Sequence, residues 1–105
     1  MEAKIKTKQD IANVLYRNRD HLRALSVSKL GLFGSFVRSE QHPDSDIDLL
    51  VEFEPGRKTF DTFMKLSFFL EEILQHKVEL LTMESLSPYI GPYIIKEVEY
   101  VAIAA

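Results

Sequence analysis

The 105-residue sequence contains no cysteine, only four glycines and four prolines, and no long apolar run. Without cysteine the chain forms no disulfide, no thiolate nucleophile and no zinc–thiolate site, which fits a reducing, cytoplasmic compartment. Its charged start, MEAKIKTKQD, lacks the apolar core of a secretory signal, and no run approaches the roughly 18 apolar residues of a membrane-spanning helix. We therefore expect a cytoplasmic protein without membrane contact.

An excess of positive charge is also missing. Lysine and arginine number 13 against 16 aspartates and glutamates, so the formal net charge is -3. Proteins that bind nucleic acids generally present a basic face that neutralises phosphates, and we expect no direct nucleic-acid partner. The three histidines are scattered and show no metal-ligand spacing. A small nucleotide or a protein is the expected substrate.

What is present is the composition of a folded globular protein. Hydrophobic residues make up 46% of the chain and charged residues 28%, which are ordinary globular values. A chain of this length buries somewhat more than about 60% of its unfolded surface, enough for one modest core. We expect a single domain over residues 1–105 and no separate binding domain.

The stretch from Gly34 to Phe53, GSFVRSEQHPDSDIDLLVEF, contains an Asp-x-Asp pair, Asp46 and Asp48, that opens an apolar run. Residues two apart in a strand share one face, so Asp46 and Asp48 should stand side by side while the apolar residues between and after them enter the core. Aspartate oxygens suit a hard cation such as Mg²⁺, which takes its other ligands from water and substrate phosphates. The pattern predicts a magnesium site.

Gly34 and Ser35 directly follow a strand-like run, Val27 to Phe33. Glycine permits a close approach to a ligand or a dihedral that a Cβ would forbid, and serine adds a hydroxyl and an amide at the start of a short helix, so the pair predicts an anion cradle. Taken alone, the pair is more simply a capped turn, but the downstream aspartates favour the cradle. Arg38 is placed either to reach a terminal phosphate or to pair with Glu40 or another surface carboxylate.

Hydrophobic periodicity predicts the other elements. Apolar residues at helical spacing follow a capping Thr7 and indicate a first helix that packs on the sheet, and a second amphipathic helix begins near Phe60, with its aromatic residues in the core. The remaining predicted elements are a short helix at Phe36–Glu40, strands at Asp46–Phe53 and Val78–Leu81, and a last helix that begins at a proline and ends near Glu97.

Two further segments allow alternatives. Glu79 lies inside the third predicted strand, where it either faces solvent at a sheet edge or joins Asp46 and Asp48 on one face; we favour the second arrangement. The last residues, Tyr100 to Ala105, are apolar and nearly uncharged. They form either a short edge strand or a surface that another chain buries, and we favour the partner.

The spacing of Gly34-Ser35, ten residues and Asp46-x-Asp48 resembles the signature of the nucleotidyltransferase superfamily that includes DNA polymerase beta and kanamycin nucleotidyltransferase. The short chain and its run SDIDLLVEF are most similar to minimal nucleotidyltransferases (MNT), the antitoxins of HEPN/MNT toxin–antitoxin pairs. The resemblance covers roughly residues 26–97 and implies an α/β (α+β) fold with a small mixed sheet, helices on one face and carboxylates on the other. It also implies a third metal-site carboxylate, commonly aspartate, at the position of Glu79.

The reaction that this resemblance implies is Mg²⁺-dependent nucleotidyl transfer. Asp46 and Asp48 would bind Mg²⁺ with the triphosphate, a second ion shared with Glu79 would activate the attacking hydroxyl, and Gly34 and Ser35 would hold the β- and γ-phosphates. The implied acceptor is a hydroxyl of a cognate HEPN toxin, which receives AMP from ATP. Two alternatives stay open: an antitoxin that acts by binding alone through its C-terminal aromatic segment, and transfer to a small molecule such as an aminoglycoside, which a chain without a second domain disfavours.

Overall fold

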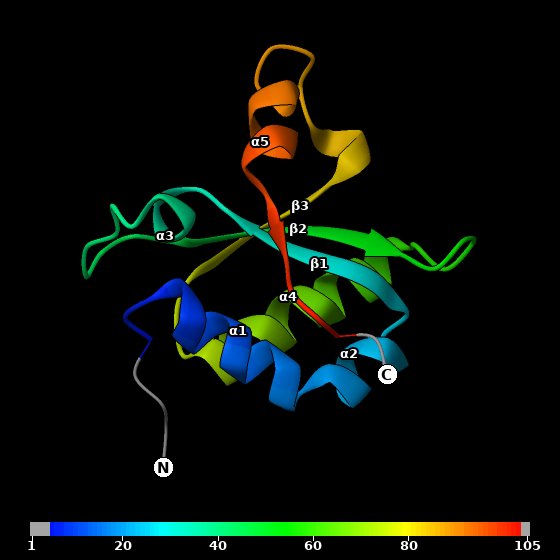
Figure 1. Cartoon of the computed structure of the whole chain (residues 1–105). Helices are drawn as coiled ribbons and strands as arrows, with labels where there is room; N and C mark the ends of the chain where they lie inside the picture. The colour runs from blue at the N-terminus through cyan, green and yellow to red at the C-terminus, as the bar shows by residue number, and fades with distance from the viewer. Residues whose placement is uncertain (1–4, 104–105) are drawn as a thin grey trace.

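The computed structural model of the chain describes residues 5–103 and has a four-stranded sheet at its centre (Figure 1). The strands lie in the order β3-β2-β1-β4. β1 (Val27–Phe33) pairs antiparallel with β2 (Ile47–Phe53) and β4 (Glu99–Tyr100), whereas β3 (Val78–Thr82) runs parallel to β2. The small mixed sheet predicted from the sequence is confirmed.

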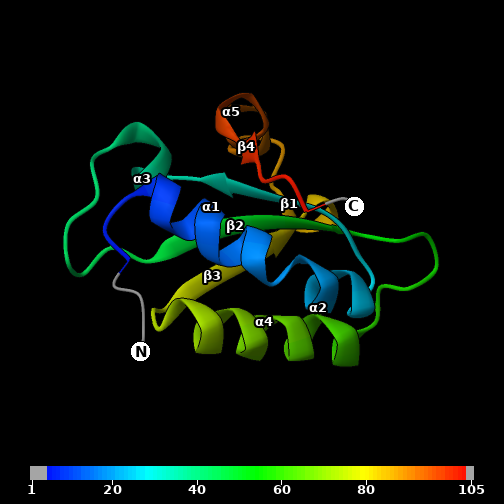
Figure 2. The same ribbon diagram turned by 60° about the horizontal axis from the view of Figure 1, so that its bottom comes forward.

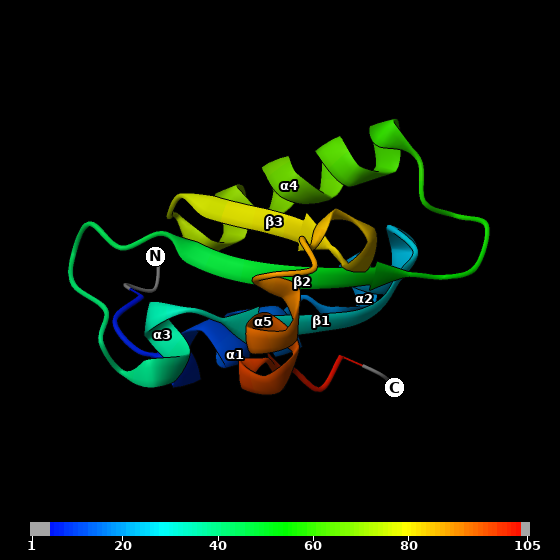
Figure 3. The same cartoon turned by 90° about the horizontal axis from the view of Figure 1, so that it is seen from above.

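Helices cover both faces of this sheet, not one face as predicted. α1, α2 and α4 lie on one side, α5 crosses the other side over β1 and β2, and α3 lies at one end of the sheet (Figures 1, 2 and 3). The helices are α1 (Lys8–Arg17), α2 (Arg19–Ala24), α3 (Ser35–Arg38), α4 (Phe60–Leu74) and α5 (Gly91–Glu97), and a 3₁₀ turn spans Met83–Ser85. Within residues 5–103, no helix has the length and apolarity to cross a bilayer.

The position of α5 follows from the apolar residues of β2, which point to both faces of the sheet. Ile47, Leu49 and Val51 join the core beneath the sheet, whereas Leu50 lies on the opposite face and is fully buried there. Leu50 packs with Phe33 of β1 and Ile94 of α5. Because an uncovered Leu50 would leave apolar area in water, α5 folds back over this face.

The first predicted helix is divided in two. Its start is confirmed: the Thr7 side chain accepts a hydrogen bond from the Asp10 backbone, and the Asp10 side chain accepts one from the Thr7 backbone, forming a capping box. At Asn18 the backbone leaves helical geometry, and the Asn18 side-chain amide donates to the carbonyl of Val14 at 2.8 Å. This local competition for a helix carbonyl accompanies the break between α1 and α2.

α4 carries the chain from β2 across to β3 and thereby makes these two strands parallel neighbours. Leu66, Leu70 and Leu74 form its fully buried stripe. The expectation that its aromatic residues lie in the core is wrong for Phe60, which is 81% exposed. Phe63 and Phe69 do pack against the core.

The C-terminal segment forms an edge strand, the first of its two predicted alternatives. In β4, Tyr100 pairs with Gly31 and Glu99 with Leu32. The chain continues along β1, where the Val101 amide donates to the Leu30 carbonyl at 2.8 Å, and Ile103 enters the core with 3% exposure. The last two residues of the predicted segment, 104 and 105, lie outside the described residues.

Candidate active site

The strand pairing gathers the three predicted carboxylates at one end of the sheet. Asp48 is the register partner of Glu79 across the parallel β2–β3 pair, and Asp46 lies immediately before β2. On its other side Asp48 is paired with Phe33, the residue before Gly34. The arrangement therefore sets Asp48 between a second carboxylate and the Gly34–Ser35 turn, which joins the two sequence motifs in space.

Asp48 lies in an unfavourable electrostatic environment. Burial, followed by the negative charges of Glu79 and Asp46, raises its pKa from 3.8 to about 6. Arg38 acts in the opposite direction without offsetting these effects. Because clustered carboxylates disfavour ionisation of one another, the site has more negative charge than its own cations neutralise. A bound cation would relieve this repulsion.

Gly34 adopts a backbone conformation that requires glycine, with φ 82° and ψ −154°. A Cβ at this position would lie 2.2 Å from Oδ2 of Asp48 and 3.0 Å from its Cγ. The obstruction thus comes from the carboxylate itself, so Gly34 allows Asp48 to pack directly against the turn. Ser35 follows as the first residue of α3, which has four residues and is slightly shorter and earlier than predicted.

Arg38 pairs with carboxylates in this structure. Its Nε donates to Glu40 Oε1 at 2.9 Å, and its Nη1 donates to Glu97 Oε1 at 2.6 Å. The hydrogen bonds and charges of Glu40 and Glu97 raise the pKa of Arg38. The second of the two alternatives for this residue is therefore observed, with Glu97 as an additional partner.

Glu97 is the residue at this site that the sequence analysis missed. It ends α5, and its Oε2 accepts a hydrogen bond from the Gly34 amide at 2.8 Å, 63 positions away in the chain. Burial alone would raise the pKa of Glu97, but the bonds from Gly34 and Arg38 outweigh it and lower that pKa. No local pattern marks Glu97 among the acidic residues of the chain, because its role depends on where α5 folds.

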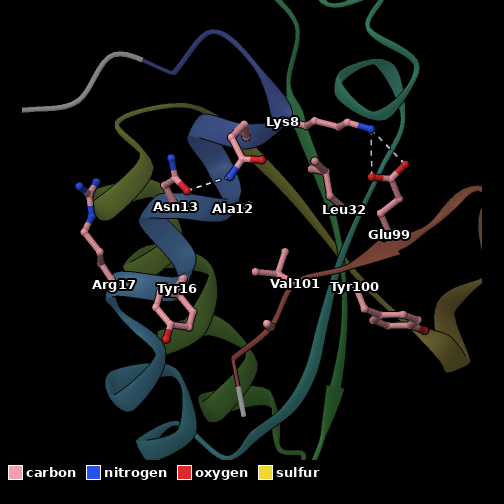
Figure 4. A pocket seen from close by; sticks show the side chains of 11 residues that line it. Lys8, Ala12, Asn13, Tyr16, Arg17, Leu32, Glu99, Tyr100 and Val101 are labelled. Carbon is pink, nitrogen blue, oxygen red and sulfur yellow. Dashed lines mark hydrogen bonds and ion pairs between the residues drawn. The ribbon is translucent and has the colours of Figure 1, made fainter. Parts of the chain in front are cut away.

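Two cavities bear on the location of the site. One of about 430 Å³ lies beside the turn and is lined by Gly34, Arg38 and Glu97 together with residues of α5 and the end of β1. Another, of about 500 Å³, lies between α1 and the C-terminal segment, where Lys8 reaches across to Glu99 (Figure 4). Asp46, Asp48 and Glu79 line neither of these two cavities. The first cavity adjoins the candidate site through Gly34, which packs against Asp48, and through Arg38.

The residues fit a magnesium ion that shares its ligands with a substrate. Among residues 5–103, no three histidine, aspartate or glutamate side chains converge as a ready-made metal cluster. Mg²⁺ does not require one, since it usually binds through one or two carboxylates plus water and substrate phosphates. Asp46 and Asp48 supply such carboxylates, and the raised pKa of Asp48 shows charge that a cation would offset.

The chain matches known proteins over most of its length. Residues 15–103 match the family model of a nucleotidyltransferase domain. The protein adenylyltransferase MntA of Thermococcus cleftensis is 36% identical over 96 residues, which cover 90% of this chain and 96% of that protein. A Methanocaldococcus jannaschii protein, provisionally named a protein adenylyltransferase, is 36% identical over 97 residues, covering 90% and 94% of the two chains.

Solved structures of similar fold include nucleotidyltransferases as well. A structure provisionally described as a minimal nucleotidyltransferase matches with a TM-score of 0.68 and 29% identity, over 84% of this chain and 93% of the other. A toxin–antitoxin structure with AMP-PNP matches with a TM-score of 0.67 over 85% and 70% of the chains. Its identity of 23% shows a shared fold alone.

Proposed function

This chain belongs to the nucleotidyltransferase domain family, and from that premise we propose that it transfers AMP from ATP to a hydroxyl group of a partner protein. The observation that carries the proposal is the contact between the two motifs: Asp48 packs so closely on Gly34 that a Cβ there would meet Oδ2 at 2.2 Å. This contact supports a site in which a candidate cation ligand, Asp48, adjoins the candidate phosphate cradle. The relatives that are 36% identical and named protein adenylyltransferases support the same chemistry.

Each residue of the candidate site would have a separate role in the transfer. Asp46 and Asp48 would hold Mg²⁺, which when bound neutralises triphosphate charge and polarises the α-phosphate. Gly34, Ser35 and Arg38 would orient the β- and γ-phosphates. Glu79, the register partner of Asp48, is exposed and would accept the proton of the attacking hydroxyl on a carboxylate oxygen. It would also contribute to a second ion.

The bond changes are those of an in-line displacement. The acceptor oxygen bonds to the α-phosphorus as the bond from that phosphorus to the bridging oxygen of pyrophosphate breaks. Pyrophosphate leaves, and AMP stays on the acceptor. No side chain of this protein becomes covalently modified, so its contribution is positioning and charge.

We propose a cognate HEPN-domain toxin as the acceptor. One structure with this fold contains a tri-AMPylated Shewanella oneidensis HEPN toxin in complex with an MNT antitoxin, at 19% identity to this chain. In this chain, a patch of exposed apolar side chains lies at α5 beside the candidate site, with Tyr89, Ile90 and Tyr93 exposed by 86%, 57% and 72%. Ile90 and Tyr93 also line the 430 Å³ cavity, so a protein that docks on this patch would reach the site.

An antitoxin that acts by binding alone is the second candidate. It is favoured by one observation: Glu97 already holds the Gly34 amide and Arg38, the groups proposed to bind phosphates. The two functions make different predictions for a variant that lacks a cation ligand. Binding alone would tolerate Asp46→Asn, whereas transfer would not.

The test is co-expression with a HEPN-domain protein encoded beside this chain, followed by the intact mass of that partner and a growth assay. With the wild type we expect partner carrying AMP and normal growth; with Asp46→Asn, partner of unmodified mass and arrested growth. Asp44→Asn, an exposed loop residue nearby, is the control and should behave as the wild type. If Asp46→Asn protects growth as well as the wild type does, and the partner carries no AMP with either protein, the binding-only antitoxin is favoured.

A further inference from the structure

The Glu97 carboxylate occupies the donors of the proposed phosphate cradle. One of its oxygens accepts the Gly34 amide at 2.8 Å and the other accepts Arg38 Nη1 at 2.6 Å. We propose that Glu97 is an affinity-determining residue of the nucleotide site: an internal carboxylate that stands in for a phosphate group and that ATP must displace in order to bind. This inference rests on the proposed function, because it concerns the same triphosphate site.

The contact satisfies the requirements of a phosphate mimic. A carboxylate presents two anionic oxygens, as does the face of a phosphate group, and both donors bind it with short charge-assisted geometry. The Glu97 side chain is 22% exposed, so these bonds are partly shielded from water. The Gly34 amide has a single hydrogen and bonds one acceptor well, so Glu97 and a phosphate oxygen compete for it.

A purely structural clamp would not need a charge at this position. Glu97 adds a negative charge close enough to Asp48 to contribute, after burial, Glu79 and Asp46, to the raised pKa of Asp48. The chain after α5 is already anchored elsewhere, by the backbone pairing of β4 with β1 and by the burial of Ile103 in the core. The bonds from Gly34 and Arg38 favour the charged form of Glu97, and the same two donors can bind the charge of a triphosphate that arrives with its cation.

Displacement would leave the cradle formed. Arg38 keeps a second bond, from Nε to Glu40 at 2.9 Å, which holds the guanidinium near the turn while its Nη groups become available. The Gly34 backbone is held by the strand pairing that precedes it, between Phe33 and Asp48. Only the Glu97 side chain and the end of α5 need to move.

The test is calorimetric titration with Mg²⁺ and ATP of the wild type, Glu97→Gln and Glu99→Gln. Glutamine keeps the size of Glu97 but removes the charge that competes with phosphate, so Glu97→Gln should bind ATP about tenfold more tightly, the effect of one charge-assisted hydrogen bond. Glu99→Gln removes an equal charge from an exposed position two residues further on and should stay within about twofold of the wild type, since exposed ion pairs contribute little.

Hydrogen exchange of the wild type is a second measurement that does not depend on the folding of a variant. Saturation with Mg²⁺ and ATP should accelerate exchange at the end of α5, over residues 94–98, because the Glu97 contacts are released. The inference would be overturned if the wild type binds Mg²⁺ and ATP and Glu97→Gln binds them no more tightly. It would also be overturned if hydrogen exchange in α5 stays unchanged or slows on binding. Either result would leave the proposed function standing. If neither the wild type nor Glu97→Gln binds Mg²⁺ and ATP, the proposed function fails, and the inference with it.

Discussion

At the level of single residues, the surroundings of Asp48 link the stability of the fold to its chemistry. The side chain is half-buried, lies next to two other carboxylates and packs on Gly34. Burial and the charges of Glu79 and Asp46 disfavour the ionised form, and despite the opposing charge of Arg38 they raise the pKa of Asp48 to about 6. A carboxylate whose ionised form is disfavoured by the fold is expected at a functional site, where a bound cation would stabilise its charge.

Asp48→Asn should therefore stabilise the metal-free protein at neutral pH while abolishing transfer. The folded pKa of Asp48 lies above its ordinary value of 3.8, so the stability contribution of this residue is present below about pH 4 and is lost as pH rises through about 6. The difference in Tm between variant and wild type should grow across that interval and then level off. Thermal melts from pH 4 to 8 in EDTA measure this difference in Tm, and added Mg²⁺ should reduce it by stabilising the wild type. A variant less stable than the wild type at every pH would show that Asp48 supports the fold.

Gly34→Ala tests the contact between the motifs, and Gly56→Ala is its matched control. Both glycines have positive φ, 82° and 76°, so both substitutions should strain the backbone, by about 1–3 kcal/mol. A Cβ at Gly56 meets nothing within 4 Å, whereas at Gly34 it displaces the Asp48 carboxylate. Only Gly34→Ala should lose binding of Mg²⁺ and ATP in calorimetry. Equal ATP affinity in the two variants would mean that Gly34 is needed only for the turn.

Glu79→Gln should remove transfer without loss of stability. Glu79 is exposed, so glutamine buries no unpaired group, and the loss of its charge eases the repulsion on Asp48. Glu79→Asp retains the carboxylate and should retain activity. Partner mass and Tm, measured on the same preparations, separate the two effects. Full AMP transfer by Glu79→Gln would remove the catalytic role from this carboxylate.

At the level of elements, the C-terminal part of the chain has a structural role as well as a functional one. α5 covers Leu50 and brings Glu97 to the turn, and the segment after it completes the sheet and the core. Removal of Tyr100 to Ala105 would therefore take Ile103 from the core, and such a truncation cannot by itself test partner binding. Substitutions at the exposed Tyr89 and Tyr93 are the appropriate probes of docking.

Ile103→Ala and Ile95→Ala form a matched pair for the structural role. Ile103 is 3% exposed and Ile95 is 49% exposed. The buried substitution should lower the free energy of unfolding by about 2–5 kcal/mol, and the exposed one by less than about 1 kcal/mol. Urea denaturation of both variants measures this difference. Similar small losses would show that the segment after β4 adds little to the core.

At the level of the whole molecule, the sequence predicted what depends on local pattern. The strand Val27–Phe33 was predicted to its ends, and the amphipathic helix from Phe60 is observed as predicted. The mixed sheet is also observed, but it was expected from the family resemblance and not from a local pattern. The approach of Asp48 to Gly34 followed from motif spacing, whereas its pairing with Glu79 was the favoured one of two alternatives and was supported by the family resemblance. These features depend only on residues that are close in the sequence or paired across neighbouring strands.

Features that depend on tertiary packing were not predicted. The place of α5 over Leu50 requires knowledge of which apolar residues the other helices leave uncovered, and the role of Glu97 depends on that place. The break at Asn18 and the exposure of Phe60 likewise depend on how the helices meet the sheet. Hydrophobic periodicity identifies an apolar face but does not name the surface that covers it.

The charge of the whole molecule leads us to expect that nucleotide binding needs a divalent cation. With a formal net charge of -3, and with Glu79 and Asp46 close enough to raise the pKa of Asp48, the protein should repel a free triphosphate. We expect ATP to bind only together with Mg²⁺ and EDTA to abolish transfer. This dependence belongs to the central claim, which is that Asp46 and Asp48 support nucleotidyl transfer to a partner protein.

Transfer of radiolabel from ATP to the HEPN-domain partner tests that claim most directly. The protein, the partner and Mg²⁺ are incubated with ATP labelled at either the α- or the γ-phosphate, and the partner is separated by denaturing electrophoresis. We predict that the partner acquires the α-label but not the γ-label, and that Asp46→Asn, Asp48→Asn or EDTA abolishes this labelling. Labelling of the partner from the γ-phosphate, or α-labelling that persists in both aspartate variants, would contradict it.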